Sequence, residues 1–127
     1  MTRKILIADD EPNIVISLEY LMKREGYEVL VARDGEEALA MIAEHEPDLL
    51  LLDAMMPKKT GFEVLQAVRG QQSAMKIIML TAKGRDTDIE KGRALGADDY
   101  VVKPFSTREL VDRVGRLLGL SADDNPE

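Results

Sequence analysis

Carboxylate side chains follow two apolar segments of the sequence, and their charge needs compensation. Asp9 and Asp10 end the segment 4-KILIADD-10, and Asp53 comes directly after four consecutive leucines. A carboxylate at the end of an apolar run is costly to desolvate unless something offsets its charge. Three such groups brought together would repel one another, so a nearby cation is expected.

A hydroxyl and an amine follow two further apolar segments. Thr81 comes after 76-KIIML-80, and Lys103 comes after 99-DYVV-102. A divalent cation would relieve the repulsion among the acids, and Mg²⁺ prefers one or two carboxylates with waters and phosphate oxygens. Lys103 would add a positive point charge. The set suits phosphoryl transfer, which depends mostly on positioning and charge neutralisation, and Asp53 is the candidate nucleophile because carboxylates can form aspartyl-phosphates.

Apolar segments of strand character alternate with amphipathic segments of helical spacing along the chain. We expect strands in 4–10, 28–32, 49–52, 76–80 and 99–102, and helices over 12–25, 36–45, 61–70, 86–95 and 107–118. This alternation predicts a doubly wound α/β fold, with a five-stranded parallel sheet and five helices on its two faces. In such sheets ligands bind outside the carboxyl ends of the strands. One edge of the molecule should therefore carry all the polar residues named above.

The composition predicts a single soluble domain. The chain has 127 residues, of which 45% are hydrophobic and 32% charged, as is ordinary for one globular domain. A net charge of −7 argues against direct nucleic-acid binding and against a polybasic membrane patch. The sequence has no cysteine, begins without a signal peptide and has no apolar run long enough to span a bilayer. We therefore expect a cytoplasmic protein without membrane contact.

Each signal has a plainer structural interpretation when it is taken alone. Asp9 and Asp10 could cap a helix that begins near Pro12. Thr81 and Lys103 could be ordinary residues at the ends of strands. The combination of all of them, in this order and at separate strand ends, is what favours a functional site.

Further residues around these positions complete a pattern. They are Met56-Pro57 and Gly61 after Asp53, Ala82 after Thr81, Pro104-Phe105 after Lys103, and the run 96-GADDYVVKPF-105. With them, residues 4–118 resemble the receiver domains of bacterial two-component response regulators, the CheY-like family. The resemblance implies a flavodoxin-like fold with strand order 2-1-3-4-5, a receiver domain over 1–120, and a flexible tail or linker over 121–127.

The resemblance also implies a reaction and a cofactor. Asp53 would accept a phosphoryl group from the phosphohistidine of a sensor histidine kinase or phosphotransfer protein. Asp10, Asp53 and the backbone carbonyl of Met55 would bind Mg²⁺, and Asp9 would act through water. The domain would catalyse only its own phosphorylation and dephosphorylation, so we expect a signalling domain and not an ordinary enzyme. Its output would be a downstream protein or an attached domain.

The remaining implied roles belong to residues at the ends of the fourth and fifth strands. The Thr81 hydroxyl and the Ala82 amide would bind the phosphoryl oxygens, and Lys103 would pair with them. Tyr100 stands at the position of an aromatic switch and would move inward as Thr81 turns towards the phosphate. The Lys103–Pro104 bond would be cis. Because phosphorylation adds about −1.5 to −2 charges, the surface formed by the fourth helix, fifth strand and fifth helix would repack.

A phosphorylation-dependent dimer through that surface is a further implication of the resemblance. Many receivers attached to winged-helix DNA-binding domains dimerise through interleaved charge pairs. Asp99 and Arg113 could supply one pair here, and Glu109 could supply half of another. Uncharged residues stand where other charged partners would be expected: Ile89, Ala94 and Gly115.

Three alternative functions remain open at this point. A phosphatase of the haloacid dehalogenase type would want a second acid two residues after Asp53, where Met55 stands. A flavodoxin-like FMN-binding module would offer hydroxyls and amides to a phosphate in its first loop, where 9-DDEPN-13 would repel one. A degenerate receiver used only as a scaffold would not need the complete set of acids, threonine and lysine.

Overall fold

Five parallel strands form one sheet in the order β2-β1-β3-β4-β5, which confirms the predicted topology. The computed structural model describes residues 2–71, 74–82 and 85–119, and the tail predicted over 121–127 lies outside them. The strands are β1 (Lys4–Ala8), β2 (Glu28–Ala32), β3 (Leu49–Asp53), β4 (Lys76–Ala82) and β5 (Asp99–Lys103). The helices are α1 (Pro12–Arg24), α2 (Gly35–His45), α3 (Gly61–Gly70), α4 (Asp86–Ala94) and α5 (Thr107–Leu117). In the described part of the chain, no helix has both the length and the apolar character needed to cross a membrane.

Three strands extend further than the sequence indicated, and the extensions contain residues of the candidate site. β3 includes Asp53, β4 continues through Thr81 to Ala82, and β5 includes Lys103. In the register of the sheet, Asp53 lies beside Leu80 and Ala82 lies beside Lys103. Asp53, Thr81 and Lys103 are therefore held by backbone pairing between strands instead of by loops. The helix boundaries agree with the expected ones to within one residue.

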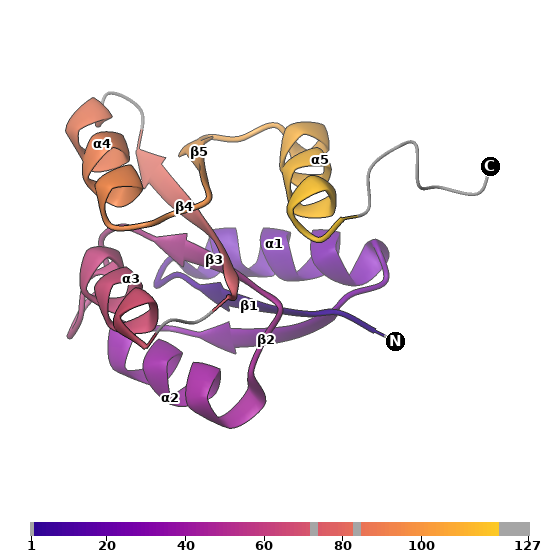
Figure 1. Cartoon of the computed structure of the whole chain (residues 1–127). Coiled ribbons are helices and arrows are strands. Elements are labelled where there is room, and N and C mark those ends of the chain that lie inside the picture. The colour runs from indigo at the N-terminus through magenta and orange to yellow at the C-terminus, as the bar shows by residue number, and fades with distance from the viewer. Residues whose placement is uncertain (1, 72–73, 83–84, 120–127) are drawn as a thin grey trace.

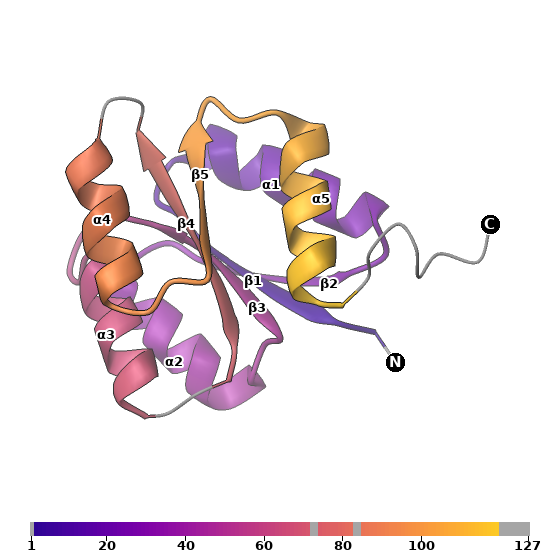
Figure 2. The same cartoon turned by 45° about the horizontal axis from the view of Figure 1, so that its top comes forward.

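Helices cover both faces of the sheet. Figures 1 and 2 show α1 and α5 on one face, and α2, α3 and α4 on the other. Alternate leucines of β3 belong to the two separate hydrophobic cores, one on each face of the sheet. Leu49 and Leu51 pack in the core below α1 and α5, whereas Leu50 and Leu52 pack in the core below α2, α3 and α4. All four are fully buried, because successive side chains of a strand point to opposite faces and both faces are covered. The leucine run is thus the central strand of the sheet.

The start of α3 is fixed against the end of β3. Thr60 and Glu63 form a capping box, in which the Glu63 amide donates to Thr60 Oγ1 at 3.2 Å and the Thr60 amide donates to Glu63 Oε1 at 3.0 Å. The Gly61 amide donates to the carbonyl of Ala54 at 2.9 Å. A Cβ atom at Gly61 would collide with the backbone of Asp53 and Ala54. Glycine therefore allows α3 to begin this close to the candidate site.

Candidate functional site

The carboxyl ends of two neighbouring strands, β1 and β3, bring the three predicted acids together. Asp9 follows β1 directly and is fully buried, the neighbouring Asp10 is exposed, and Asp53 is 7% exposed at the end of β3. One carboxylate oxygen from each of the three lies within 4.8 Å of the others. Although Asp53 lies 44 positions after Asp9 in the sequence, the pairing of β1 with β3 places them at the same edge. The expectation that polar residues after the strands gather at the carboxyl edge of the sheet therefore located these acids correctly.

Lys103 compensates part of this negative charge. Its Nζ lies 2.9 Å from Asp9 Oδ2, 3.0 Å from Glu11 Oε1 and 3.5 Å from Asp53 Oδ1. Burial lowers the pKa of Lys103, but the hydrogen bonds to Asp9 and Glu11 and the nearby carboxylates together raise it above its usual value. Lys103 therefore stays charged at neutral pH. Sequence reasoning missed Glu11, although it directly follows Asp10 in the run 9-DDE-11.

The charge of Asp53 is only partly balanced. Burial raises the pKa of Asp53 to about 7, and repulsion from Asp9 and Asp10 adds to the increase. The attraction of Lys103 and the amide of Met55, which lies 3.4 Å from Asp53 Oδ1, act in the opposite direction. One lysine thus leaves an excess of negative charge among the acids. A divalent cation with oxygen ligands fits this site, because it would remove the repulsion and hold Asp53 in its ionised form.

A pocket of about 310 Å³ lies beside Asp53. Its lining includes Asp53, Lys103 and Met55, so there is open space next to the carboxylate and the amine. α4 contributes Asp88, and Arg85 precedes that helix; the guanidinium Nε of Arg85 lies 3.0 Å from Asp88 Oδ2. Sequence reasoning did not single out these two residues, because nothing in their local sequence relates them to Asp53.

Thr81 carries a hydroxyl with no hydrogen-bond partner among the described residues. Thr81 is 1% exposed, and its Oγ1 is buried. A buried hydroxyl without a partner is uncommon in folded proteins and costs free energy. Ala82 follows it as the last residue of β4 and is exposed. The hydroxyl thus has unused hydrogen-bonding capacity, although Thr81 itself is not among the residues that line the pocket beside Asp53.

Tyr100 is half-buried on β5 and packs against the core on the α2, α3 and α4 side. Two guanidinium groups flank its ring: Arg93 lies 4.6 Å from the ring centroid, and Arg113 lies 6.0 Å from it. Such contacts between a cation and an aromatic face are attractive.

The peptide bond from Lys103 to Pro104 is cis.

Asp99, Glu109 and Arg113 were expected to form charge pairs across a dimer interface. In the structure they form ion pairs with one another inside one chain. Arg113 Nη1 lies 2.6 Å from Asp99 Oδ1, and Arg113 Nη2 lies 3.1 Å from Glu109 Oε1. The carboxylate of Asp99 also accepts a hydrogen bond from the amide of Tyr100. Arg113 therefore links α5 to β5 within the same molecule.

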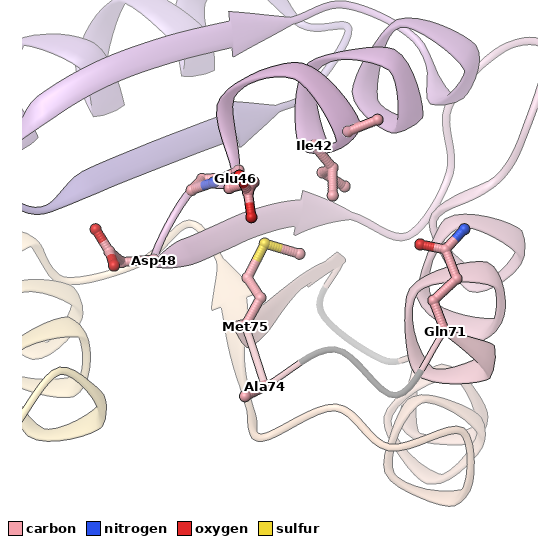
Figure 3. A pocket seen from close by; sticks show the side chains of 8 residues that line it. Ile42, Glu46, Asp48, Gln71, Ala74 and Met75 are labelled. Carbon is pink, nitrogen blue, oxygen red and sulfur yellow. The ribbon is translucent and has the colours of Figure 1, made fainter.

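Another pocket, of about 490 Å³, lies at the opposite end of the sheet. In Figure 3, Ile42 and Glu46 from the α2 side face Gln71 at the end of α3, and Met75 points in between them from the start of β4. Asp48 also lines this pocket, and one oxygen of its carboxylate accepts a hydrogen bond from the backbone amide of Lys4 at 2.7 Å. Since this pocket is remote from the three acids and the lysine, we place the chemistry at the carboxyl edge.

Sequence and structure comparisons both find similar proteins. The model of the family described as "Response regulator receiver domain" matches residues 5–115. The alkaline phosphatase synthesis transcriptional regulatory protein PhoP of Bacillus subtilis (strain 168) is 49% identical over 118 residues, which make up 93% of this chain and 49% of PhoP. The chain thus spans about half the length of that relative.

Two solved structures show how closely the fold agrees. A putative response regulator from Chloroflexus aurantiacus J-10-fl superposes with a TM-score of 0.88 at 37% identity, covering 94% of this chain and 99% of that one. The chemotaxis protein CheY4 of Vibrio cholerae superposes with a TM-score of 0.85 at 35% identity, covering 92% of this chain and 99% of CheY4.

Proposed function

Because the chain belongs to the response regulator receiver domain family, we propose that it accepts a phosphoryl group on Asp53 from a phosphohistidine of a partner protein. The observation that carries the proposal is the position of Asp53: it is almost buried at the end of the central strand, beside an open pocket and 3.5 Å from the Lys103 amine. An Asp53 oxygen attacks phosphorus, the bond from phosphorus to the histidine nitrogen breaks, and its electron pair leaves with the imidazole.

The ionised form of Asp53 is the nucleophile in this reaction. Since burial and neighbouring acids raise the pKa of Asp53 to about 7, a large share of the metal-free protein would carry a protonated, unreactive carboxyl at neutral pH. Asp10, Asp53 and the Met55 carbonyl would hold Mg²⁺, and Asp9 would act through water. When bound, Mg²⁺ supplies positive charge that offsets the charge of the acids and of the phosphoryl oxygens.

Three groups at the ends of β4 and β5 receive the phosphoryl oxygens. Lys103 pairs with one of them and keeps the phosphoryl group at the site. The Thr81 hydroxyl gains the hydrogen-bond partner that it lacks among the described residues, and the Ala82 amide donates as well. Hydrolysis later reverses the modification, because water attacks phosphorus, inorganic phosphate leaves and the Asp53 carboxylate is regenerated.

Movement of Thr81 towards the phosphoryl group transmits the signal. When the Thr81 side chain moves into the site, it leaves room for the ring of Tyr100. The ring, which lies between Arg93 and Arg113, can then turn inward. The surface formed by α4, β5 and α5 then repacks. A downstream partner selects one of the two surfaces, for which a free-energy difference of a few kcal/mol is sufficient.

The same family membership supports a proposal for the biological setting. We propose that a sensor histidine kinase or phosphotransfer protein supplies the phosphoryl group in the cytoplasm. Residues 1–120 act as the receiver, and the output is a downstream protein or an attached domain. The domain acts as a signalling switch that modifies only itself. A phosphorylation-dependent dimer through the α4, β5 and α5 surface requires that Arg113 exchange its partners within the chain for partners in a second copy.

Intact-mass measurement after incubation with a small acyl phosphate and Mg²⁺ tests the assignment. The parent protein should gain one phosphoryl group, and Asp53→Asn should gain none. Asp112→Asn is the matched control, because Asp112 is an exposed acid on α5 and this variant should react like the parent. Phosphorylation of Asp53→Asn at the parent rate would show that another residue is the acceptor.

A further inference from the structure

Glu11 is the N-cap residue of α1, yet its side chain makes no capping hydrogen bond in the described part of the chain. The short polar side chains preferred at this position, those of Ser, Thr, Asp and Asn, ordinarily accept a hydrogen bond from the first turn of the helix, and Glu is not one of them. Here the carboxylate instead accepts a hydrogen bond from Lys103 Nζ at 3.0 Å. The backbone amide of Glu11 donates to Asp9 Oδ1 at 2.9 Å, which fixes the start of the side chain beside the acids.

Lys103 is thereby shared among three carboxylates. An ammonium group has three N–H donors; hydrogen bonds run to Asp9 at 2.9 Å and to Glu11 at 3.0 Å, whereas Asp53 lies at 3.5 Å. The amine is thus held more closely by the two residues near β1 than by the proposed phosphoacceptor. A phosphoryl group on Asp53 needs that same amine within hydrogen-bond distance, but Nζ stands 3.5 Å from Asp53 while it holds the other two carboxylates. The amine must therefore move towards Asp53, and one of its present contacts must lengthen.

Burial decides which partner yields. The side chain of Asp9 is 0% exposed, and a buried carboxylate left without its cation is strongly unfavourable. The side chain of Glu11 is 59% exposed, so water can replace the amine at little cost. Release of Glu11 is therefore the less costly rearrangement.

We propose that Glu11 is a positioning residue, which holds Lys103 in the unphosphorylated protein and gives it up when phosphoryl oxygens occupy the site. The inference rests on the proposed phosphorylation of Asp53 and adds a determinant of its stability. Because the Glu11–Lys103 contact must be broken, Glu11 opposes the phosphorylated state. Its removal strengthens the binding of a phosphoryl group.

A direct repulsion between Glu11 and a phosphoryl group would act in the same direction, and two further variants separate the two effects. Glu11→Asp keeps the negative charge but is one methylene shorter, so its carboxylate cannot make the same contact with Lys103. In a Lys103→Met background there is no amine to hold, so only the direct repulsion remains.

Beryllofluoride with saturating Mg²⁺ is the probe, and its dissociation constant is measured by calorimetry. In the parent background, Glu11→Gln and Glu11→Asp should each bind beryllofluoride about three- to tenfold more tightly, which is the scale of one partly exposed charged contact. In the Lys103→Met background, Glu11→Gln should change the constant less than twofold. The control Glu44→Gln removes an equal charge from an exposed position at the far end of α2 and should bind like the parent. Mg²⁺ affinity is measured for each variant without beryllofluoride.

The outcomes distinguish the inference from the function on which it rests. An equal effect of Glu11→Gln with and without Lys103, or unchanged binding by Glu11→Asp, would show that Glu11 acts by charge alone and would overturn the inference. Unchanged binding by Glu11→Gln in the parent background would do the same, while phosphorylation at Asp53 stands. A parent that binds no beryllofluoride and gains no phosphoryl group would overturn both.

Discussion

Replacement of Asp53 by asparagine should stabilise the metal-free protein, and the gain should grow with pH. The environment raises the pKa of Asp53 from 3.8 to about 7. Each pH unit of this difference corresponds to about 1.4 kcal/mol, so ionisation of Asp53 costs the folded state about 4 kcal/mol. The amide side chain of the Asp53→Asn variant carries no charge at any pH and would avoid this cost.

The sign of the effect follows from proton binding. Between pH 3.8 and about 7 the folded protein keeps a proton on Asp53 that the unfolded chain has lost, so the free energy of unfolding falls as pH rises through this interval. Below it both states are protonated, and above it both are ionised. The advantage of Asp53→Asn should therefore be small near pH 4 and reach its full size near pH 8.

Urea unfolding followed by circular dichroism, in the presence of a chelator, measures this difference between pH 4.5 and 8. Asp112→Asn serves as the control, because its side chain is 66% exposed and its effect should not vary over this interval. Saturating Mg²⁺ should flatten the pH dependence of the parent. A difference between parent and Asp53→Asn that stays constant with pH would refute the reasoning that burial and repulsion oppose the charge of Asp53.

Three further predictions concern the metal, the switch and the loop between β3 and α3. Asp10→Ala should reduce the increase in thermal stability that Mg²⁺ gives the parent, since one of few direct ligands is lost; an equal increase would contradict its role. Thr81→Ala should still accept phosphate, but beryllofluoride should change its amide hydrogen exchange over 86–102 less than that of the parent. The lost coupling free energy between the site and this surface should be ~1–3 kcal/mol. An undiminished change at equal occupancy would exclude Thr81 as the coupling residue. Gly61→Ala should lower the free energy of unfolding by about 1–3 kcal/mol, because its Cβ meets backbone, whereas Gly70→Ala in the same helix has open space and should raise it by up to about 1 kcal/mol; similar effects of the two would show that the loop adjusts.

The order of helices and strands could be predicted from the sequence because the signals are local. The four leucines of β3 are buried on two faces of a covered strand, as an unbroken apolar run indicates. Parallel strands place their carboxyl ends at one edge, and that rule alone brought Asp53, Thr81 and Lys103 together. The order of the strands in the sheet depends on pairing between distant segments, and only the family resemblance indicated it.

The sequence also left the environment of neighbouring residues undecided. Asp9 and Asp10 are adjacent acids with equivalent local signals, yet Asp9 is fully buried and Asp10 is exposed. Both residues lie just beyond the end of β1, where the alternation of a strand no longer sets the direction of a side chain. Only the packing of helices and loops around the sheet edge determines which direction leads into the protein and which leads to solvent.

By itself, the sequence determined which residue types stand at the ends of the strands, and hence the chemistry that this edge of the molecule can perform. The tertiary structure alone decided the partners of those residues. Glu11 reaches Lys103 across 92 positions of the chain, and Arg85 and Asp88 enter the same pocket from the region of α4. The physical reason is that charge interactions depend on distance and burial in space, and the fold sets both through contacts that no local segment encodes.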